Sequence, residues 1–327
     1  MKNYKSIYGD KIEKFILMKK ALGFKYQTST FILSAIDDFA YQRQEVSEGI
    51  TKDFADSWGT KRATESDTYR YARVRILAQF SSFLRDLNIS SHIPKLPPWT
   101  KSNFIPHIYS DKEVQALFNA CDDLKVKSKT IESAVFCMPA LIRLLYATGI
   151  RISEAMELKD EDINPDINTI KIKDSKNGEE RIMPFSDSLS FVFKEYLKYK
   201  NQIYKTKGRG GYFFENMKGE KISYNSISNW FKQSLEKAGI KNLGRKQGAR
   251  IHDLRHTFAC HALVNMVENG LDLYVSLPIL STYLGHRSLE STNTYVRLTS
   301  NMYPELIKNA DLVCLDVFPK TKYHETD

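Results

Sequence analysis

The sequence predicts a mainly α-helical chain of two domains with one small antiparallel β-sheet. Three observations support this prediction. Apolar residues recur at helical spacing over most of the chain, a proline-rich segment interrupts it near residue 95, and two alternating runs flank one Asn-Gly turn. A length of 327 residues also exceeds the usual size of a single hydrophobic core.

The first domain is expected to span residues 1–94 and to consist of helices. Apolar residues follow helical periodicity in three stretches, residues 11–22, 30–42 and 69–87. Gly23 follows the first stretch, as is typical of a residue that ends a helix. The third stretch also carries arginines, which on a basic chain favour contact with phosphates.

A linker is expected at residues 95–107, before a second domain at residues 108–327. The run Ile-Pro-Lys-Leu-Pro-Pro-Trp at 93–99 cannot continue a helix, because proline lacks the amide donor and clashes with the preceding turn. Residues 110–113, Ser-Asp-Lys-Glu, then form the typical start of a new helix, with serine as N-cap and glutamate three positions later.

A β-hairpin is expected inside the second, mostly helical domain. Thr169–Lys173 alternates apolar and polar residues, and Glu180–Pro184 returns after the turn Ser-Lys-Asn-Gly. Asn-Gly between alternating runs is a strong hairpin signal, and it places Lys176 at the exposed tip.

Composition limits the class of partner and compartment. The formal net charge of +9 favours a polyanionic partner, and the apolar fraction of 42% is that of an ordinary globular protein. No signal peptide opens the chain, and the apolar stretch 134–150 is interrupted by Pro139 and Arg143, so we expect a cytoplasmic protein without a membrane span. The cysteines form no C-x-x-C pair, so reduced thiols are expected and a structural zinc is not.

Four short stretches of the second domain carry residues suited to chemistry. They are residues 147–154 (A-T-G-I-R-I-S-E), the hairpin tip, residues 252–259 (H-D-L-R-H-T-F-A), and residues 284–295, where a tyrosine follows Leu-Gly-His by nine positions. Each has an ordinary explanation when taken singly, as a surface charge, a structural histidine or a packed tyrosine. Their combination is what indicates a function.

Together these stretches resemble the tyrosine recombinases, or phage-type integrases. That family has an arginine in a T-G-x-R-x-S-E box, a hairpin lysine, an H-x-L-R-H box, an L-G-H box and a tyrosine about nine residues later. The matching residues here are Arg151, Lys176, His252, Arg255, His286 and Tyr295. The C-terminal boxes are the specific part of the resemblance, whereas the N-terminal helices match the family's core-binding domain only in general character.

The resemblance implies a site-specific DNA recombinase that forms a 3′-phosphotyrosine intermediate and passes through a Holliday junction. Arg151 and Arg255 would stabilise the charge of the pentacoordinate transition state, so neither a metal nor ATP nor another cofactor is expected. His252 would act as the base or proton relay for Tyr295, because a phenol with a reference pKa of about 10 is a weak nucleophile. Lys176 would protonate the leaving 5′-oxygen.

Two further residues complete the expected site. His286 would hydrogen-bond a non-bridging oxygen of the phosphate. Glu154 would orient the first arginine from behind.

The resemblance also implies a two-domain clamp on double-stranded DNA. The basic residues expected to contact phosphates are Lys25, Arg70, Arg73, Arg245, Lys246 and Arg250. The apolar segment after Tyr295 is expected either to dock on a neighbouring protomer of a homotetramer bound to two DNA sites or to pack on its own domain. Helical sequence begins almost at the first residue, so an Xer-like or transposon-type enzyme without an arm-binding domain is expected.

Two other classes fit part of the pattern. His252 and His256 lie four positions apart and, with Asp253 or His286, could hold a metal in a phosphodiesterase, although this is a small ligand set. A DNA-binding protein without catalysis is the other alternative. The spacing from Arg255 to His286 is longer than in compact members of the family, and we expect residues 266–277 to form an additional loop.

Overall fold

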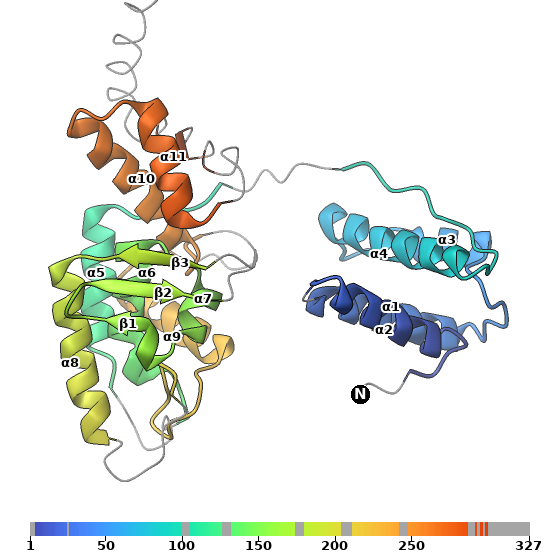
Figure 1. The fold of residues 1–327 in the computed structure, drawn as a ribbon, viewed down its shortest axis with the longest axis horizontal. Helices are drawn as coiled ribbons and strands as arrows, with labels where there is room; N and C mark the ends of the chain where they lie inside the picture. The colour runs from blue at the N-terminus through green and yellow to red at the C-terminus, as the bar shows by residue number, and fades with distance from the viewer. Residues whose placement is uncertain are drawn as a thin grey trace, which may run out of the picture. The chain divides into compact units, whose positions relative to one another are not determined.

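The computed structural model divides into two compact units, Met1–Phe104 and Ile105–Asp327 (Figure 1). The division falls inside the segment 95–107, and residues 90–99 contain no helix or strand. The structure describes residues 4–24, 26–99, 105–125, 132–173, 180–203, 211–241, 248–286, 292, 295–296 and 298–299.

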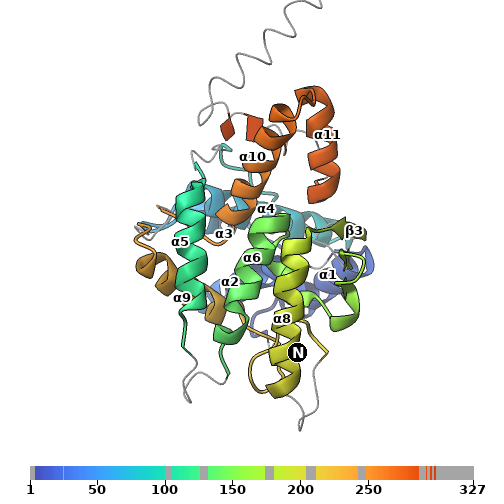
Figure 2. The same cartoon turned by 90° about the vertical axis from the view of Figure 1, so that its left-hand side faces the viewer.

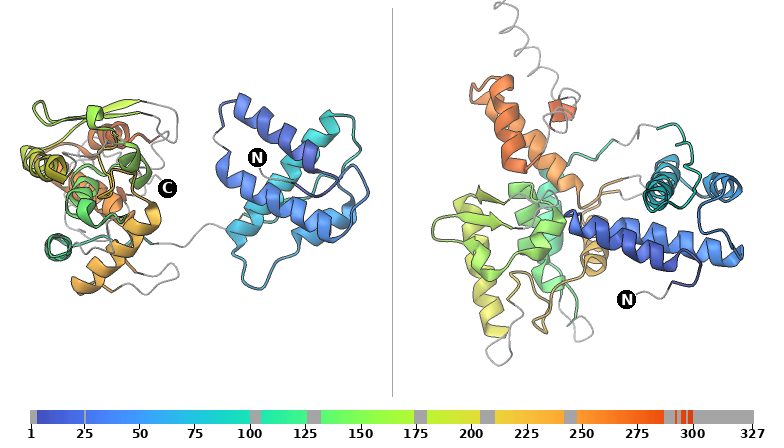
Figure 3. Two further views of the ribbon diagram at one scale, coloured as in Figure 1. Left: turned by 90° about the horizontal axis from the view of Figure 1, so that it is seen from below. Right: turned by 45° about the vertical axis from the view of Figure 1, so that its right-hand side comes forward.

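The first unit is a bundle of helices, as the sequence predicts. Its helices in the described ranges are α1 (Gly9–Ala21), α2 (Gln27–Gln42), α3 (Lys52–Gly59) and α4 (Asp67–Asp86). Figure 3 shows α1 and α2 running alongside each other. Their inward faces bury an aromatic-rich core in which Phe15, Phe54 and Phe80 are fully enclosed. Burial of such side chains is the main stabilising contribution to a small helical unit.

Local signals set the ends of these helices. Ser66 accepts a hydrogen bond from the backbone N–H of Tyr69 and so caps α4. The backbone of Gly23 adopts a φ of +83° and ends α1, as predicted. Helix α3 was not expected from the sequence. It spans only two turns, and its stability depends on packing of Phe54 and Trp58 rather than on length.

The structure contradicts one expected DNA contact in this unit. The side chain of Arg73 is 1% exposed and lies inside the unit against the ring of Trp58. Its guanidinium donates to both carboxylate oxygens of Glu65, at 2.8 and 2.9 Å, and to the carbonyls of Trp58 and Thr60. A phosphate cannot reach a guanidinium whose donors are used in this way, so the assignment of Arg73 to DNA is wrong.

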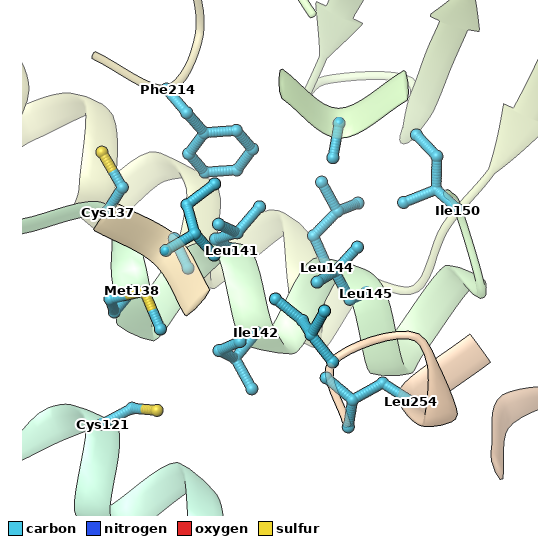
Figure 4. Close-up of a cluster of buried hydrophobic side chains, with 14 of the residues drawn as sticks. Cys121, Cys137, Met138, Leu141, Ile142, Leu144, Leu145, Ile150, Phe214 and Leu254 are labelled. Atoms are coloured by element: carbon cyan, nitrogen blue, oxygen red, sulfur yellow. The ribbon is translucent and has the colours of Figure 1, made fainter. Parts of the chain in front are cut away.

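The second unit is built around helix α6. Its elements in the described ranges are α5 (Asp111–Asp122), η2 (Val135–Cys137), α6 (Met138–Thr148), α7 (Ile152–Glu157), η3 (Asp160–Asp162), β1 (Ile163–Asn164), β2 (Thr169–Ile172), β3 (Arg181–Pro184), α8 (Asp187–Ile203), α9 (Tyr224–Lys237), α10 (Asp253–Glu268) and α11 (Leu273–Leu284). Figure 2 shows α6 between α5 and α8. Leu141, Leu144 and Leu145 of α6 are buried in a core shared with Phe214 and Leu254 (Figure 4).

The predicted hairpin strands form part of a three-stranded antiparallel sheet with the order β1-β2-β3. Ile170 pairs with Met183, and Ile172 pairs with Arg181. Ile170, Ile172 and Met183 are buried, as the alternating pattern predicts. The turn that joins β2 to β3, including Lys176, lies outside the described residues.

The additional residues between Arg255 and His286 do not form a loop, so the expectation for residues 266–277 is wrong. Residues 266–268 belong to α10 and residues 273–277 belong to α11, so only residues 269–272 connect the two helices. Asn269 ends α10 and Gly270 has a φ of +81°. Helices α10 and α11 therefore form a pair that packs together beside the rest of the unit (Figure 1). Within the described ranges, no helix has both the length and the apolar character needed to cross a bilayer.

Candidate active site

The first site arginine, Arg151, follows a tight turn at Gly149, and this turn requires glycine. Helix α6 ends at Thr148, and Gly149 follows with a φ of +61°. A Cβ at this position would overlap the ring of Phe258 on α10 and press on Leu284 of α11. The close approach allows α6, α10 and α11 to meet, and Arg151 begins α7 at that junction.

Glu154 holds Arg151 in place. The Arg151 guanidinium donates to Glu154 Oε1 at 2.7 Å and to the carbonyl of Gly285 at 3.1 Å, and the Arg151 backbone N–H donates to Glu154 Oε2 at 3.2 Å. Glu154 is buried, and burial alone raises the pKa of its carboxyl. Hydrogen bonds and charge from Arg181, and then from Arg151, outweigh this effect and lower the pKa. Glu154 is therefore ionised at neutral pH.

The second arginine ties three segments together. Arg255 is 3% exposed and lies one helical turn after His252, the N-cap residue of α10. Its guanidinium donates to the carbonyl of Gly149 at 2.7 Å, to the carbonyl of Leu284 at 2.8 Å and to His286 Nε2 at 2.9 Å. Burial, followed by repulsion from Arg151, lowers the pKa of Arg255 to about 10. The group remains charged at pH 7.

The bonds of His286 define its tautomer. Arginine has no acceptor, so Nε2 of His286 must accept from Arg255, and the ring proton of neutral His286 must lie on Nδ1. Nδ1 then donates to Thr292 Oγ1 at 2.8 Å. Burial and the charges of Arg255, Arg151 and Arg181 lower the pKa of His286 to about 4, so the ring is uncharged at neutral pH.

Tyr295 is enclosed by α10, α11 and two histidine rings. Its side chain is 3% exposed and belongs to an apolar cluster with Cys260, Leu263 and Leu284. The Tyr295 ring stacks on His286 with centroids 6.0 Å apart, and the His256 ring centroid lies 5.7 Å away on another side. Burial raises the pKa of Tyr295 despite the opposing effect of Arg255, so the phenol is protonated at neutral pH.

His256 of α10 lies beside this tyrosine, and His252 contacts His256. The rings of His252 and His256 meet edge to face at 5.0 Å. Desolvation and the charge of Arg255 lower the pKa of His252, which leaves a neutral ring able to accept a proton. In the described part of the chain, no three His, Cys, Asp or Glu side chains gather as a metal site would require.

Arg181 belongs to the same cluster, although no motif in the sequence assigns it a role. Its guanidinium donates to Glu154 Oε2 at 2.8 Å and also lies against Gly285. Arg181 occupies the same face of β3 as the buried Met183. An arginine in register with a buried residue of an alternating strand is the signal that could have identified it.

The structure therefore brings together five of the expected site residues, namely Arg151, Glu154, Arg255, His286 and Tyr295. His252 joins them through His256. Lys176 lies outside the described residues, as do the expected DNA contacts Lys25, Arg245 and Lys246. Arg250 is paired with Asp253 at 2.9 Å, and Arg70 donates to the carbonyl of Gly59 at 2.8 Å.

Two guanidinium groups beside a buried tyrosine, with neutral imidazoles around it, make up a site for phosphoryl transfer to a tyrosine hydroxyl. Comparison with known proteins agrees with this class. Residues 108–302 match the model of the phage integrase family, and the chain belongs to this family of tyrosine recombinases. It is a DNA strand-transferring enzyme that recombines DNA at specific sites by cleavage and rejoining.

Several relatives resemble it over most of their length. One relative is the integrase/recombinase y4rB of Sinorhizobium fredii, by its name. The chain is 28% identical to it, over 93% of this chain and 96% of the relative. It is 27% identical to tyrosine recombinase XerA of Pyrococcus horikoshii, over 73% of each chain. A lambda integrase dimer bound to a core site shares the fold, with a TM-score of 0.60, 16% identity and coverage of 88% and 94% of the two chains.

Proposed function

We propose that Tyr295 is the nucleophile and that cleavage produces a 3′-phosphotyrosine and a free 5′-hydroxyl. The observation that carries this proposal is the hydrogen bond between Arg255 and His286, whose ring stacks on Tyr295. The Arg255 guanidinium, the His286 ring that accepts its hydrogen bond and the Tyr295 phenol therefore lie next to one another. The phenol oxygen forms a bond to phosphorus while the bond from phosphorus to the 5′-oxygen breaks.

Each of the other residues receives a role in that step. Arg151 and Arg255 stabilise the extra negative charge on the equatorial oxygens, and Glu154 positions Arg151. His252 takes the proton of Tyr295, and Lys176 gives a proton to the leaving 5′-oxygen. Attack by the 5′-hydroxyl of another strand reverses the step and joins that strand, and two such exchanges pass through a Holliday junction.

His286 changes its bonding partner in this proposal. In the described site Nε2 accepts from Arg255, so it cannot donate to a phosphate oxygen at the same time. A bound phosphate adds negative charge between Arg255 and His286 and therefore raises the pKa of the imidazole. A protonated His286 then donates from Nε2 to a non-bridging oxygen while Nδ1 keeps Thr292.

No metal, ATP or other cofactor enters this proposal. The arginines supply the positive charge that a metal would otherwise bring, and the phosphotyrosine ester conserves the energy of the broken bond. Cleavage is therefore expected to persist in excess chelator. Loss of cleavage in chelator, with recovery on added Mg²⁺ or Zn²⁺, would favour a metal-dependent phosphodiesterase.

The two domains and the assembly are also part of the proposal. Residues 1–94 would bind DNA and residues 108–327 would catalyse, with 95–107 as a linker, so that the domains clamp the duplex. Lys25, Arg70, Arg245, Lys246 and Arg250 would contact phosphates. A homotetramer on two DNA sites is supported by the lambda integrase tetramer bound to a Holliday junction, which shares the fold. We place the protein in the cytoplasm with the nucleoid, because its substrate is DNA.

Covalent trapping tests the proposal directly. A pool of nicked duplexes of random sequence releases a short strand after cleavage, so that cleaved molecules stay linked to protein and can be recovered and sequenced. Wild-type protein is expected to select a defined duplex and to form the adduct. Tyr295→Phe should bind that duplex with unchanged affinity and form no adduct, whereas an adduct with Tyr295→Phe would assign the chemistry to another residue.

A further inference from the structure

Arg181 is held in the site by two separate contacts. Its side chain is 13% exposed, and its guanidinium donates to Glu154 Oε2 at 2.8 Å, with a longer contact of 3.4 Å to Oε1. On its other side it packs against Gly285, where an added Cβ would lie 3.0 to 3.3 Å from three guanidinium atoms. Gly285 has a φ of +65°, a conformation that favours glycine, and a Cβ there would also press on the Arg181 guanidinium.

These contacts close a ring of interactions. Arg181 donates to Glu154, Glu154 accepts from Arg151, and Arg151 donates to the carbonyl of Gly285 at 3.1 Å. The ring joins β3, α7 and the residues that follow α11. It therefore links the first residue of the third strand to the arginine expected to bind the phosphate and to the residue before His286.

The charge balance of the ring differs from that of a structural ion pair. Two guanidiniums share one carboxylate, and the buried Arg255 beside them adds another positive charge. Such an excess of positive charge, one group buried and two partly buried, is costly unless an anion binds. The Nε atom of Arg181 is also buried and has no hydrogen-bond partner among the described residues. Stability alone does not account for a third arginine here.

We propose that Arg181 is a positioning residue of the cleavage site, which holds Arg151 through Glu154 and supports the backbone of Gly285 before His286. This inference rests on the proposed function, because it concerns the same phosphate. Because Arg181 also binds the Glu154 carboxylate, this carboxylate cannot rotate together with the Arg151 side chain. The Arg151 guanidinium therefore stays directed at the place where the phosphate binds. Its charge also adds to the attraction of the site for that anion.

Single-turnover cleavage of the duplex recovered by covalent trapping tests the inference. Arg181→Ala is expected to slow adduct formation at saturating DNA by about 10- to 100-fold, the range typical of a lost supporting contact. The dissociation constant for the duplex should stay within about threefold, because most phosphate contacts lie elsewhere. Arg181→Lys, which keeps the charge and one donor, should recover part of the rate.

A matched control separates this effect from general destabilisation. Arg143 of α6 donates to both oxygens of Asp122, at 2.7 Å each, and lies in the same unit outside the ring. Arg143→Ala removes an arginine–carboxylate pair of the same kind and is expected to cleave at the wild-type rate. All variants are compared at a temperature where thermal unfolding shows each of them to be folded.

A double-mutant cycle tests whether Arg181 acts through Glu154. Glu154→Gln and Arg181→Ala should be non-additive, and the double variant should be at most about threefold slower than the slower single variant. Additive defects would overturn the inference.

A second substrate tests whether Arg181 acts instead through Lys176, which precedes it by five positions. A 5′-bridging phosphorothiolate has a leaving group that departs without a proton. Recovery of Arg181→Ala on this substrate would assign its effect to the lysine and would overturn the inference. The defect is expected to persist there.

The possible failures are distinguishable. If wild-type protein forms no adduct with any duplex, the proposed function is wrong. If wild-type protein forms the adduct and Arg181→Ala forms it at the same rate, the function stands and the inference is wrong.

Discussion

The two units each bury an arginine, and the two arginines are bonded differently. Arg73 of the first unit donates to both oxygens of Glu65, so its charge is neutralised where it lies. Arg255 of the second unit donates to two carbonyls and a neutral histidine, and the structure gives it no carboxylate partner among the residues it describes. A paired buried charge supports a fold, whereas an unpaired one retains its attraction for an anion. Burial alone therefore does not distinguish a structural arginine from a functional one.

The largest expected effect is on the chemistry at Arg255. Arg255→Ala should lower the rate of adduct formation by about 10³-fold or more, as loss of a transition-state arginine does in other phosphoryl transfers. Its free energy of unfolding should fall less than that of Arg73→Ala, since no ion partner is left behind. Single-turnover cleavage and urea unfolding measure the two quantities. A large loss of stability with normal cleavage would show that Arg255, like Arg73, serves the fold and not the reaction.

The next effect is on stability at Arg73. Arg73→Ala leaves Glu65 buried without its partner and is expected to cost about 3–5 kcal/mol of unfolding free energy. Arg75 on the same helix is exposed, so Arg75→Ala serves as the control and should change stability by less than about 0.5 kcal/mol. Equal urea midpoints for the two variants would show that the Arg73 network contributes little.

A smaller effect is expected at Lys176, the cation placed by sequence at the hairpin tip. Lys176→Ala should slow cleavage of an ordinary phosphodiester by about 10²-fold, which is typical of a lost general acid. The rate should recover on a 5′-bridging phosphorothiolate, while Arg151→Ala should show no recovery because both substrates develop the same equatorial charge. Equal defects of Lys176→Ala on both substrates would limit the lysine to holding DNA.

The smallest effect tests the anion site without DNA. Sulfate at ten times its dissociation constant should stabilise the wild-type protein by about 1.4 kcal/mol, whereas Arg255→Ala should respond much less. His286 has a pKa of about 4 without an anion, and a bound sulfate should raise this pKa as the phosphate does, so the stabilisation should weaken as the pH rises through the raised pKa. Thermal unfolding at constant ionic strength measures it. A gain that stays constant between about pH 6 and pH 8 would show that the anion binds without protonating His286.

Short sequence motifs predicted most of the site residues, because the geometry within each motif depends only on residues that are neighbours in the sequence. The turn before Arg151 and the spacing from His252 to Arg255 depend on neighbouring residues, and the structure preserves both. Contacts between boxes depend on tertiary packing, so the link from Arg181 to Glu154 could not be predicted from spacing alone.

Helical periodicity predicted most of the helices of the first unit. The same periodicity also indicates that Arg73 is buried. Arg73, Leu77, Phe80 and Leu84 recur at intervals of four, three and four positions, which places the arginine on the buried stripe of α4. Its charge favoured a surface interpretation, and only the position of Glu65 shows why burial is tolerated. Short α3 was missed because two turns carry too weak a periodic signal.

The unpaired charge of Arg255 has an evolutionary consequence. An apolar residue of similar volume at position 255 would remove the buried charge but leave the carbonyls of Gly149 and Leu284 without their donor, so a gene copy released from selection for recombination would tolerate the change at a modest cost in stability. Decay of the activity therefore costs little folding free energy, in contrast to position 73, where the same substitution would leave Glu65 buried without its partner and would be rejected in active and inactive copies alike. Copies that have lost recombination should accumulate changes at 255 long before they accumulate them at 73.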